Sequence, residues 1–291
     1  MMKKILNLIL CVTFTLPLQA QIRQLADSVL RGSTDSVRIS YNNILIQQMS
    51  EFLKADKSFT TSFDSVKSIS TIKSSDGLIR FYQWAMPLME SNTFQIYGFM
   101  QVQDKKTKTL NVWQLTDINE DKYSVSEKIL TPDNYYAAVY YSIIPLKSGK
   151  KTIYTLLGWR GNTPRTSLKV IDVLTFKNNK PVFGKKIFTS PPKMLPVLPA
   201  NKCARIIFEY NANAVMSLKY YPNKKQIVFD HISPSKESLK GLEEFYGPDM
   251  SYDAFKWKKG KWNGIADIDI RNKNNTDGKK TAPIKDSELH K

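Results

Sequence analysis

The first hydrophobic residues after position 20 recur at helical spacing. Ile22, Leu25, Ala26, Val29 and Leu30 follow the i, i+3, i+4, i+7 pattern of one helix face. Gly32 ends this run, and Ser33-Thr34-Asp35 offers an N-cap for a second helix. The apolar stripe of that second helix comprises Tyr41, Ile44, Leu45, Met49, Phe52 and Leu53. The pattern predicts helices over 22–31 and 35–55, so we expect residues 21–60 to form a helical segment packed on the body.

From about residue 64 the pattern changes to short β-rich runs, many of them alternating. These runs predict strands over 66–72, 78–84, 94–102, 110–115, 135–146, 152–159, 168–176, 181–188, 204–210, 215–221, 226–231, 252–257 and 262–270. Short polar turns join them, among them Ser74-Ser75-Asp76-Gly77 and Lys258-Lys259-Gly260-Lys261. Asp-Gly between two β-rich runs is a strong hairpin signal.

The fold class follows from what separates the strands. No segment of helical period lies between them, so parallel βαβ units, which need crossover helices, are disfavoured. We expect a mainly β domain over 61–270, an antiparallel meander of about a dozen short strands. Its closure as a curved sheet, a sandwich or a propeller-like ring stays open. The prolines at 191, 192, 196 and 199 predict a connector, because proline cannot donate to a sheet ladder.

The N-terminus has the layout of a bacterial secretory signal peptide over residues 1–20. Lys3 and Lys4 form a positive region, residues 5–16 are apolar, and Ala20 places a small residue at the cleavage position. The apolar run is shorter than the roughly 20 residues that a transmembrane helix needs. We therefore expect export to the periplasm, the outer surface or the medium.

The C-terminal tail is polar, and many turns of the chain are rich in lysine. The polar segment 271–291 carries almost no apolar residues, which predicts a disordered tail. The chain has 43 Lys and Arg against 26 Asp and Glu. Many of the lysines fall in turns spread along the sequence. This scatter favours solvated tips over a nucleic-acid stripe, although the net charge would attract anionic envelope polymers.

Cysteine and histidine are too few for several kinds of site. Cys11 lies in the predicted signal peptide and His290 in the tail, so the body holds only Cys203 and His231. A structural zinc site needs four such ligands and a disulfide needs two cysteines. We therefore expect no metal and no cofactor, and we expect Cys203 to be a small buried hydrophobe.

His231 is the one imidazole of the body that could act as a general base. It ends a predicted strand, and Asp230 beside it would point to the opposite sheet face. The chain has no Gly-x-Ser-x-Gly nucleophile motif. We expect His231 to bond a backbone group.

Paired carboxylates could hydrolyse glycosides without histidine or metal. The candidates are Asp249 with Asp253, and Asp267 with Asp269. The first pair lies in a stretch rich in turn formers, and the second would line the wet face of a half-buried strand. Structural roles are favoured for both pairs.

Candidate ligand-binding residues are Trp159, Arg160 and Asn162, together with Tyr246. A tryptophan followed by an arginine and an amide in a turn could stack on a sugar ring and hydrogen-bond it. The competing interpretation, which the pattern favours, is a turn anchored by a buried tryptophan.

Four stretches resemble a group of uncharacterised exported proteins from Bacteroidetes-type bacteria. They are residues 157–162 (LGWRGN), 169–174 (KVIDVL), 229–234 (FDHISP) and 245–253 (FYGPDMSYD). The likeness spans roughly residues 66–270 and implies a bacterial envelope location and one continuous domain. No activity, ligand or catalytic residue comes with it.

Two functional hypotheses follow. The leading one is a non-enzymatic, exported envelope or extracellular protein that binds glycans or anionic envelope polymers, or serves structurally. The alternative is an aspartate-dependent hydrolase acting on saccharides. Neither hypothesis involves nucleic acid or a membrane span.

Overall fold

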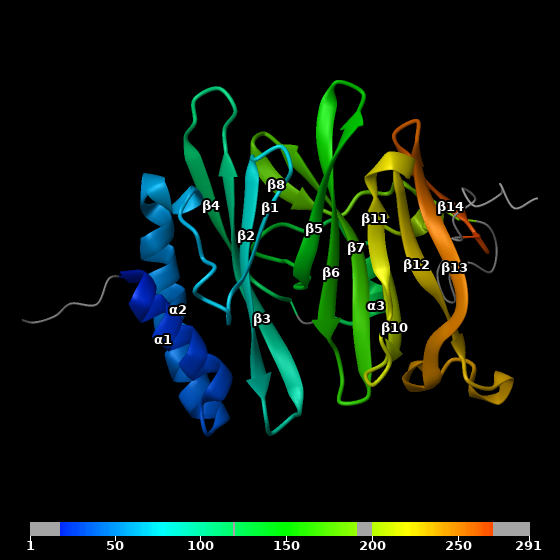
Figure 1. Cartoon of the computed structure of the whole chain (residues 1–291), viewed down its shortest axis with the longest axis horizontal. Coiled ribbons are helices and arrows are strands. Elements are labelled where there is room, and N and C mark those ends of the chain that lie inside the picture. Colours follow the sequence, from blue (N-terminus) through cyan, green and yellow to red (C-terminus); the bar gives the residue numbers. More distant parts are fainter. Residues whose placement is uncertain (1–17, 119, 191–199, 270–291) are drawn as a thin grey trace, which may run out of the picture.

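The computed structural model describes residues 18–118, 120–190 and 200–269. Over these residues, a helical layer and three sheets follow one another along the longest axis of the molecule (Figure 1). The mainly β, antiparallel architecture with an N-terminal helical segment is confirmed. The predicted proline connector, the polar tail and most of the predicted signal peptide lie outside the described residues.

The helical layer consists of α1 (Leu18–Arg31) and α2 (Asp35–Lys54). The predicted N-cap is present, because the hydroxyl of Thr34 accepts a hydrogen bond from the Val37 backbone N–H at 3.3 Å. The buried residues of α1 belong to the predicted stripe: Ile22, Ala26 and Val29.

The buried face of α2 differs from the predicted stripe. Tyr41 and Ile44 are exposed, while Asn42 is buried. The physical reason is a polar bond, in which the Trp84 indole N–H donates to the Asn42 side-chain oxygen at 2.7 Å. The carboxylate of Asp35 likewise accepts backbone N–H groups from the turn after residue 88. Satisfied polar groups therefore set the orientation of the first half of α2.

The first sheet has the order β1-β2-β3-β4 and lies against the helices. Its strands are β1 (Ser70–Lys73), β2 (Ile79–Leu88), β3 (Thr93–Gln103) and β4 (Leu110–Leu115). Alternation along β2 covers both faces: Phe81 packs toward the next sheet and Tyr82 toward the helices. The Asp-Gly hairpin between β1 and β2 is confirmed, with Gly77 at φ +72°.

The middle sheet has the order β10-β7-β6-β5, and β8 also pairs with β7. Its strands are β5 (Val139–Ser148), β6 (Lys151–Gly161), β7 (Thr166–Lys177), β8 (Lys180–Phe183) and β10 (Ile206–Asn211). Leu156 packs toward the first sheet and Leu157 toward the last. Because both of its faces are covered, β6 is a nearly continuous buried run.

The last sheet has the order β11-β12-β13-β14-β9. Its strands are β9 (Phe188–Thr189), β11 (Leu218–Tyr221), β12 (Gln226–Pro234), β13 (Tyr246–Lys258) and β14 (Lys261–Ile265). The pairing of β14 with β9 is parallel, an exception among the described strands. Short helical turns are η1 (Asp56–Phe59), η2 (Ala200–Lys202), η3 (Pro222–Lys224), η4 (Glu237–Leu239) and η5 (Glu243–Phe245).

Several predicted strand limits are wrong. The strand predicted over 135–146 begins at Val139, and the one predicted over 262–270 ends at Ile265. The sequence pattern also missed α3 (Lys122–Ser126), a short helix between β4 and β5. Its five residues are too few for a visible helical period.

Each contact between two sheets contains a buried polar bond. Between the first and middle sheets, the Gln83 side-chain oxygen accepts the Tyr140 N–H at 2.9 Å. Between the middle and last sheets, the Trp262 indole donates to the Thr155 hydroxyl at 2.9 Å. Such bonds fix the lateral register of layers that apolar contacts alone would leave free to slide.

A fully buried ion pair joins the middle sheet to α3. The Arg205 Nε lies 3.1 Å from the Asp172 Oδ2, and both side chains are 0% exposed. Asp172 also accepts the Tyr140 hydroxyl, at 3.4 Å. Arg205 Nη1 donates to the carbonyls of Val125 and Lys128, at the C-terminal end of α3. The pair therefore holds α3 in place on the sheet.

Removal of one partner of the Asp172–Arg205 ion pair should destabilise the folded protein. We predict that Asp172→Ala lowers the free energy of unfolding by about 3–5 kcal/mol, because Arg205 is left as a buried, uncompensated charge. Urea unfolding measures the loss. The matched control is Glu51→Ala, which breaks the exposed Lys54–Glu51 pair and should leave the free energy nearly unchanged. Equal losses in the two variants would contradict this role.

Candidate functional site

A cleft of about 830 Å³ lies where α3 and β10 meet the end of β12. Residues 235–245, which we name the β12–β13 linker, close one side of it, and Tyr246 at the start of β13 also lines it. The lining combines apolar side chains with several charged and phenolic groups. A cleft of this size and mixed lining is typical of small-molecule sites.

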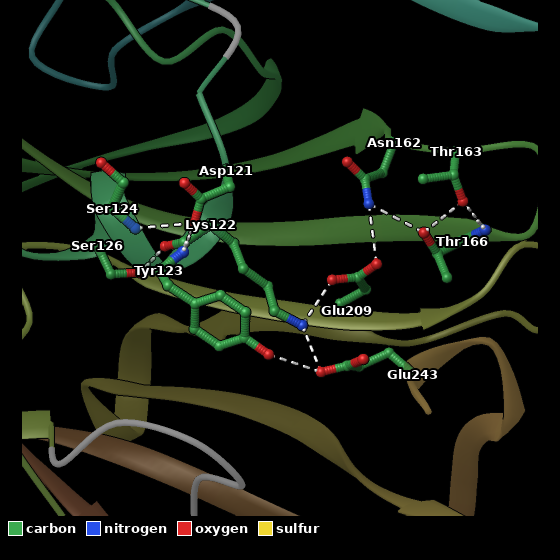
Figure 2. Close-up of polar contacts among 10 residues, drawn as sticks. All are labelled: Asp121, Lys122, Tyr123, Ser124, Ser126, Asn162, Thr163, Thr166, Glu209 and Glu243. Atoms are coloured by element: carbon green, nitrogen blue, oxygen red, sulfur yellow. Dashed lines mark hydrogen bonds and ion pairs between the residues drawn. The ribbon is translucent and has the colours of Figure 1, made fainter. Parts of the chain in front are cut away.

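Lys122 is the centre of the polar wall of the cleft (Figure 2). Its Nζ lies 2.6 Å from Glu209 Oε2 and 2.7 Å from Glu243 Oε1. The Tyr123 hydroxyl donates to the same Glu243 oxygen at 2.9 Å. The Asn162 amide donates to Glu209 Oε1 at 2.9 Å. One ammonium group thus ties together α3, β10 and the β12–β13 linker.

Local sequence explains why these side chains meet. The Asp121 carboxylate accepts the backbone N–H groups of Tyr123 and Ser124 at 2.9 and 3.0 Å, which starts α3 and places Lys122 in its first turn. On β10, Phe208 points into the core between the middle and last sheets, so Glu209 points to the other face. That face is the one on which the Lys122 ammonium lies.

The pKa values of Lys122 and Glu243 in this wall reflect a balance between burial and hydrogen bonding. Burial lowers the pKa of Lys122, but the hydrogen bonds to Glu209 and Glu243 outweigh it and raise the pKa above its ordinary value. Burial raises the pKa of Glu243, but the bonds from Lys122 and Tyr123 outweigh it and leave the pKa below its ordinary value. Lys122 and Glu243 are therefore both charged at neutral pH.

His231 also lines the cleft and has a carboxylate partner. Its Nδ1 is 2.8 Å from Asp253 Oδ2, and its Nε2 is 4.0 Å from Asp249 Oδ2. The prediction of a backbone partner is wrong. The reason is a bulge in the β12–β13 ladder, where the register shifts between Asp230 and Ile232. The buried Asp253 also accepts the backbone N–H of residue 267 at 2.8 Å.

The aspartates proposed as hydrolytic pairs do not line this cleft. Asp253 is 2% exposed, and its carboxylate is hydrogen-bonded to the His231 ring. Asp249 lies within β13, beside the left-handed residue Met250, and accepts the Ser251 N–H and hydroxyl. Burial raises the pKa of Asp249, but these bonds and the nearby His231 lower it overall. The expected turn at Asp249 is therefore a strand irregularity, and its carboxylate lies beside the imidazole.

The second aspartate pair is not on a strand. Asp267 and Asp269 follow the end of β14, and Asp267 has a left-handed backbone at φ +53°. The prediction that they share the wet face of a strand is therefore wrong. The ladder is interrupted after Ile265, but the chain continues beside β13, where the Ile268 N–H bonds the Tyr252 carbonyl at 2.7 Å.

The predicted sugar-contacting turn is mostly architectural. Trp159 is half-buried and packs edge-to-face on Phe94, with ring centroids 6.2 Å apart. Arg160 is buried, lies 2.7 Å from the Asp117 carboxylate and donates to the Ala137 carbonyl. Both residues lie in β6, so these contacts fix the end of a strand, and the predicted turn begins only after Gly161.

Of the other candidates, Tyr246 lines the cleft and Asn162 contacts one of its lining residues. Asn162 positions Glu209 through the hydrogen bond described above. Tyr246 lines the cleft, and its hydroxyl accepts the Gly241 backbone N–H at 3.0 Å, which fixes the β12–β13 linker. Cys203, which also lines the cleft, is buried as expected, and burial raises the pKa of its thiol.

Sequence reasoning missed the central residues Lys122, Tyr123, Glu209 and Glu243. One signal was available, because Glu209 interrupts the apolar run of β10 with an acid. An acid placed there needs a partner. The partners come from segments more than thirty residues away on either side, so no local pattern could identify them.

The comparisons with known proteins give no assignment. No protein-family model matches the chain, and no curated protein and no solved structure matches it. Among residues 18–118, 120–190 and 200–269, no helix is long and apolar enough to cross a membrane. In the same residues no group of three or more His, Cys, Asp or Glu side chains is placed to hold a metal ion. The function must therefore be inferred from the geometry of the cleft.

Acidification should release the β12–β13 linker from α3. The folded-state pKa of Glu243 lies below the ordinary 4.5, so its contact with Lys122 stabilises the linker above that pH and is lost as pH falls through the lower value. Hydrogen exchange of residues 235–245, corrected for intrinsic rates, should rise by tenfold or more over that range.

Two variants make this test specific. Glu243→Gln should give fast exchange of residues 235–245 at every pH and abolish the rise in exchange on acidification. Glu244→Gln should preserve it, because Glu244 pairs only with the exposed Arg165. A rise on acidification that survives Glu243→Gln would show that another group holds the linker.

Proposed function

We propose that the chain is an exported, non-enzymatic binding module whose cleft holds a neutral saccharide unit. The observation that carries this proposal is the preformed polar wall made by Lys122, Glu209 and Glu243, which faces a cleft of ligand size. Volumes of about 300–1,000 Å³ are usual for such sites.

The charges of the cleft favour a neutral ligand. Lys122 is bonded to two glutamates, Arg205 is paired with a buried aspartate, and Lys240 lies 3.3 Å from Glu237. The cations of the lining are therefore already compensated, in a chain whose net charge is +17. A polyanion would find little to bind there, whereas a ligand that offers hydroxyl groups would not have to break these pairs.

The cleft also has the groups that a sugar requires. A carboxylate offers about four acceptor positions, and Glu209 and Glu243 use some of them internally. Sugar hydroxyls can donate to the others. The Tyr123 ring, 45% exposed at the rim, can stack on the apolar face of a pyranose. Ile206 and Ile232 supply an apolar floor.

Sequence features support the location. The signal-peptide pattern of residues 1–20 would deliver the protein to the cell envelope or beyond. Glycans are abundant polymers there, and the resemblance to exported Bacteroidetes-type proteins points to the same compartment.

The alternative is saccharide hydrolysis by carboxylates, and fewer observations favour it. A hydrolase needs one carboxylic acid that stays protonated, with a raised pKa. The pKa of Glu243 is instead lowered, and Glu209 shares the same lysine. The binding experiment separates the hypotheses, because a bound oligosaccharide is recovered intact from a binding module and cleaved from a hydrolase.

Binding should depend on the exposed ring at the rim. We predict that the protein without residues 1–20 is retained by a neutral glycan on an array, and that Tyr123→Ala weakens the dissociation constant by tenfold or more. Glu209→Gln should weaken it similarly, because one charged acceptor is lost. Isothermal titration calorimetry with the retained glycan measures both effects.

The matched control is Tyr221→Ala. Tyr221 is also 45% exposed but lies at the end of β11, outside the cleft. Its replacement should leave affinity unchanged. Equal losses from the two tyrosine variants, or no retention on any neutral glycan, would refute the proposal.

A further inference from the structure

Strand order places six hairpin turns at one end of the molecule. In an antiparallel sheet successive turns alternate between the two ends. The turns β1–β2, β3–β4, β5–β6, β7–β8, β11–β12 and β13–β14 all lie at the top of Figure 1. These turns come from all three sheets, and we name this surface the basic end.

Lysines dominate the basic end. Fourteen occur in the six turns and their first flanking positions: Lys73, Lys105, Lys106, Lys108, Lys147, Lys150, Lys151, Lys177, Lys180, Lys224, Lys225, Lys258, Lys259 and Lys261. All are exposed, and none forms an ion pair with another described residue. The acids of the same turns are Asp76 and Asp104, which close their own turns.

The opposite end is different. The β2–β3 turn, the β6–β7 turn and the β12–β13 linker carry Arg165, Lys236 and Lys240 together with Glu90, Glu237, Glu243 and Glu244. Charges of both signs are therefore mixed there. The lysines are spread along the sequence, but they gather in three dimensions because turns far apart in the chain share one end.

Direct contacts join the turns of different hairpins into one surface. A Cβ atom built on Gly260 would lie 3.4 Å from the Ser148 hydroxyl, so the β13–β14 turn touches the β5–β6 turn of the middle sheet. The Trp257 N–H donates to the Lys225 carbonyl at 2.9 Å, which joins the β11–β12 and β13–β14 turns.

A further contact reaches the first sheet. The Tyr154 hydroxyl, on the middle sheet, donates to the Asp76 carboxylate of the β1–β2 turn at 2.8 Å. The tips of neighbouring sheets are thus held against one another.

We propose that the basic end is a docking surface for a linear anionic polysaccharide. Packed sheets lie about 10 Å apart, so the lysine tips recur at that interval along the longest axis of the molecule (Figure 1). This interval is close to the Debye length of about 8 Å at physiological ionic strength, so the fields of neighbouring tips overlap. A row of overlapping positive fields attracts a chain with regularly spaced negative groups.

The composition of the turns favours an anionic polysaccharide over nucleic acid or an anionic membrane. The six turns and their first flanking positions carry no arginine and one exposed aromatic side chain, Tyr221, whereas nucleic-acid surfaces use several such groups to stack on bases and grip phosphates. A single tyrosine ring also provides little apolar area for insertion into a bilayer. Lysine acts as a hydrated point charge, which suits carboxylate or sulfate groups on a hydrophilic polymer.

The basic end is separate from the cleft. The β12–β13 linker that closes the cleft belongs to the opposite end of the last sheet (Figure 1). The two surfaces can therefore be occupied together, and loss of one leaves the other measurable. Failure of the saccharide site in the cleft would not affect this proposal.

The test compares two triple variants of equal charge. Lys106, Lys150 and Lys258, one from each sheet, are replaced by glutamine. The control replaces Arg23, Arg31 and Lys236, which are exposed on the helical layer and the opposite end. The readouts are the dissociation constant for polygalacturonate and for dextran sulfate at 0.15 M salt, and its dependence on salt.

We expect the basic-end variant to bind at least tenfold more weakly. Its plot of log K against log salt should flatten by about one unit for each lysine that no longer pairs with an anionic group of the polymer. The affinity of the control should fall by less than threefold. Thermal unfolding of both variants should match that of the parent protein, since every replaced side chain is exposed.

Three results would overturn the proposal. Equal losses of affinity in the two variants would show that net charge alone attracts the polymer. Tighter binding to duplex DNA or to anionic lipid vesicles at the same salt would assign the basic end to another partner. If an anionic disaccharide competed as effectively as the polymer, binding would not need a surface that spans several turns.

Discussion

The buried ion pair between Asp172 and Arg205 fixes the wall on which the cleft is built. The Arg205 Nε pairs with the carboxylate of the middle sheet, and Nη1 donates to the Val125 carbonyl in α3 and to the Lys128 carbonyl just after it. A helix of five residues has little stability of its own, so its position depends on such contacts. Because Lys122 lies in the first turn of α3, the same pair determines where the two glutamates are held. The chemistry of the cleft thus depends on a buried ion pair of which Arg205 lines the cleft and Asp172 does not.

The layered fold also explains how much of the architecture could be predicted. Alternation and turn chemistry identify most strands, and the N-cap at Thr34 identifies the second helix. The predicted buried face of α2 is wrong because the hydrogen bond to Trp84 buries Asn42. Hydrophobic periodicity gives no information about such a polar bond. The division into three stacked sheets was not predictable either, since a strand such as β6, buried on both faces, gives the same apolar run in many arrangements.

Prediction of the site had a similar limit. Sequence reasoning chose residues by their chemical type, and it found His231, Asn162 and Tyr246, all of which belong to the cleft or support it. It could not find the bulge that gives His231 the carboxylate of Asp253, because a register shift depends on pairing between distant segments. The gathering of lysines was hidden for the same reason, since the lysines of six separate turns meet only after the sheets stack. The protein thus combines a cleft whose charges are compensated with an uncompensated basic surface at one end.

The Asp172–Arg205 pair positions α3 and thereby preforms the cleft. The most direct measurement is amide hydrogen exchange in the double variant Asp172→Leu, Arg205→Met. Removing both charges together should leave global stability nearly unchanged, because apolar residues of similar volume can replace a buried ion pair. We expect exchange in residues 122–128 and 235–245 to rise by tenfold or more, while exchange in α1, α2 and the first sheet stays as in the parent protein. Unchanged protection of residues 122–128 would contradict the claim.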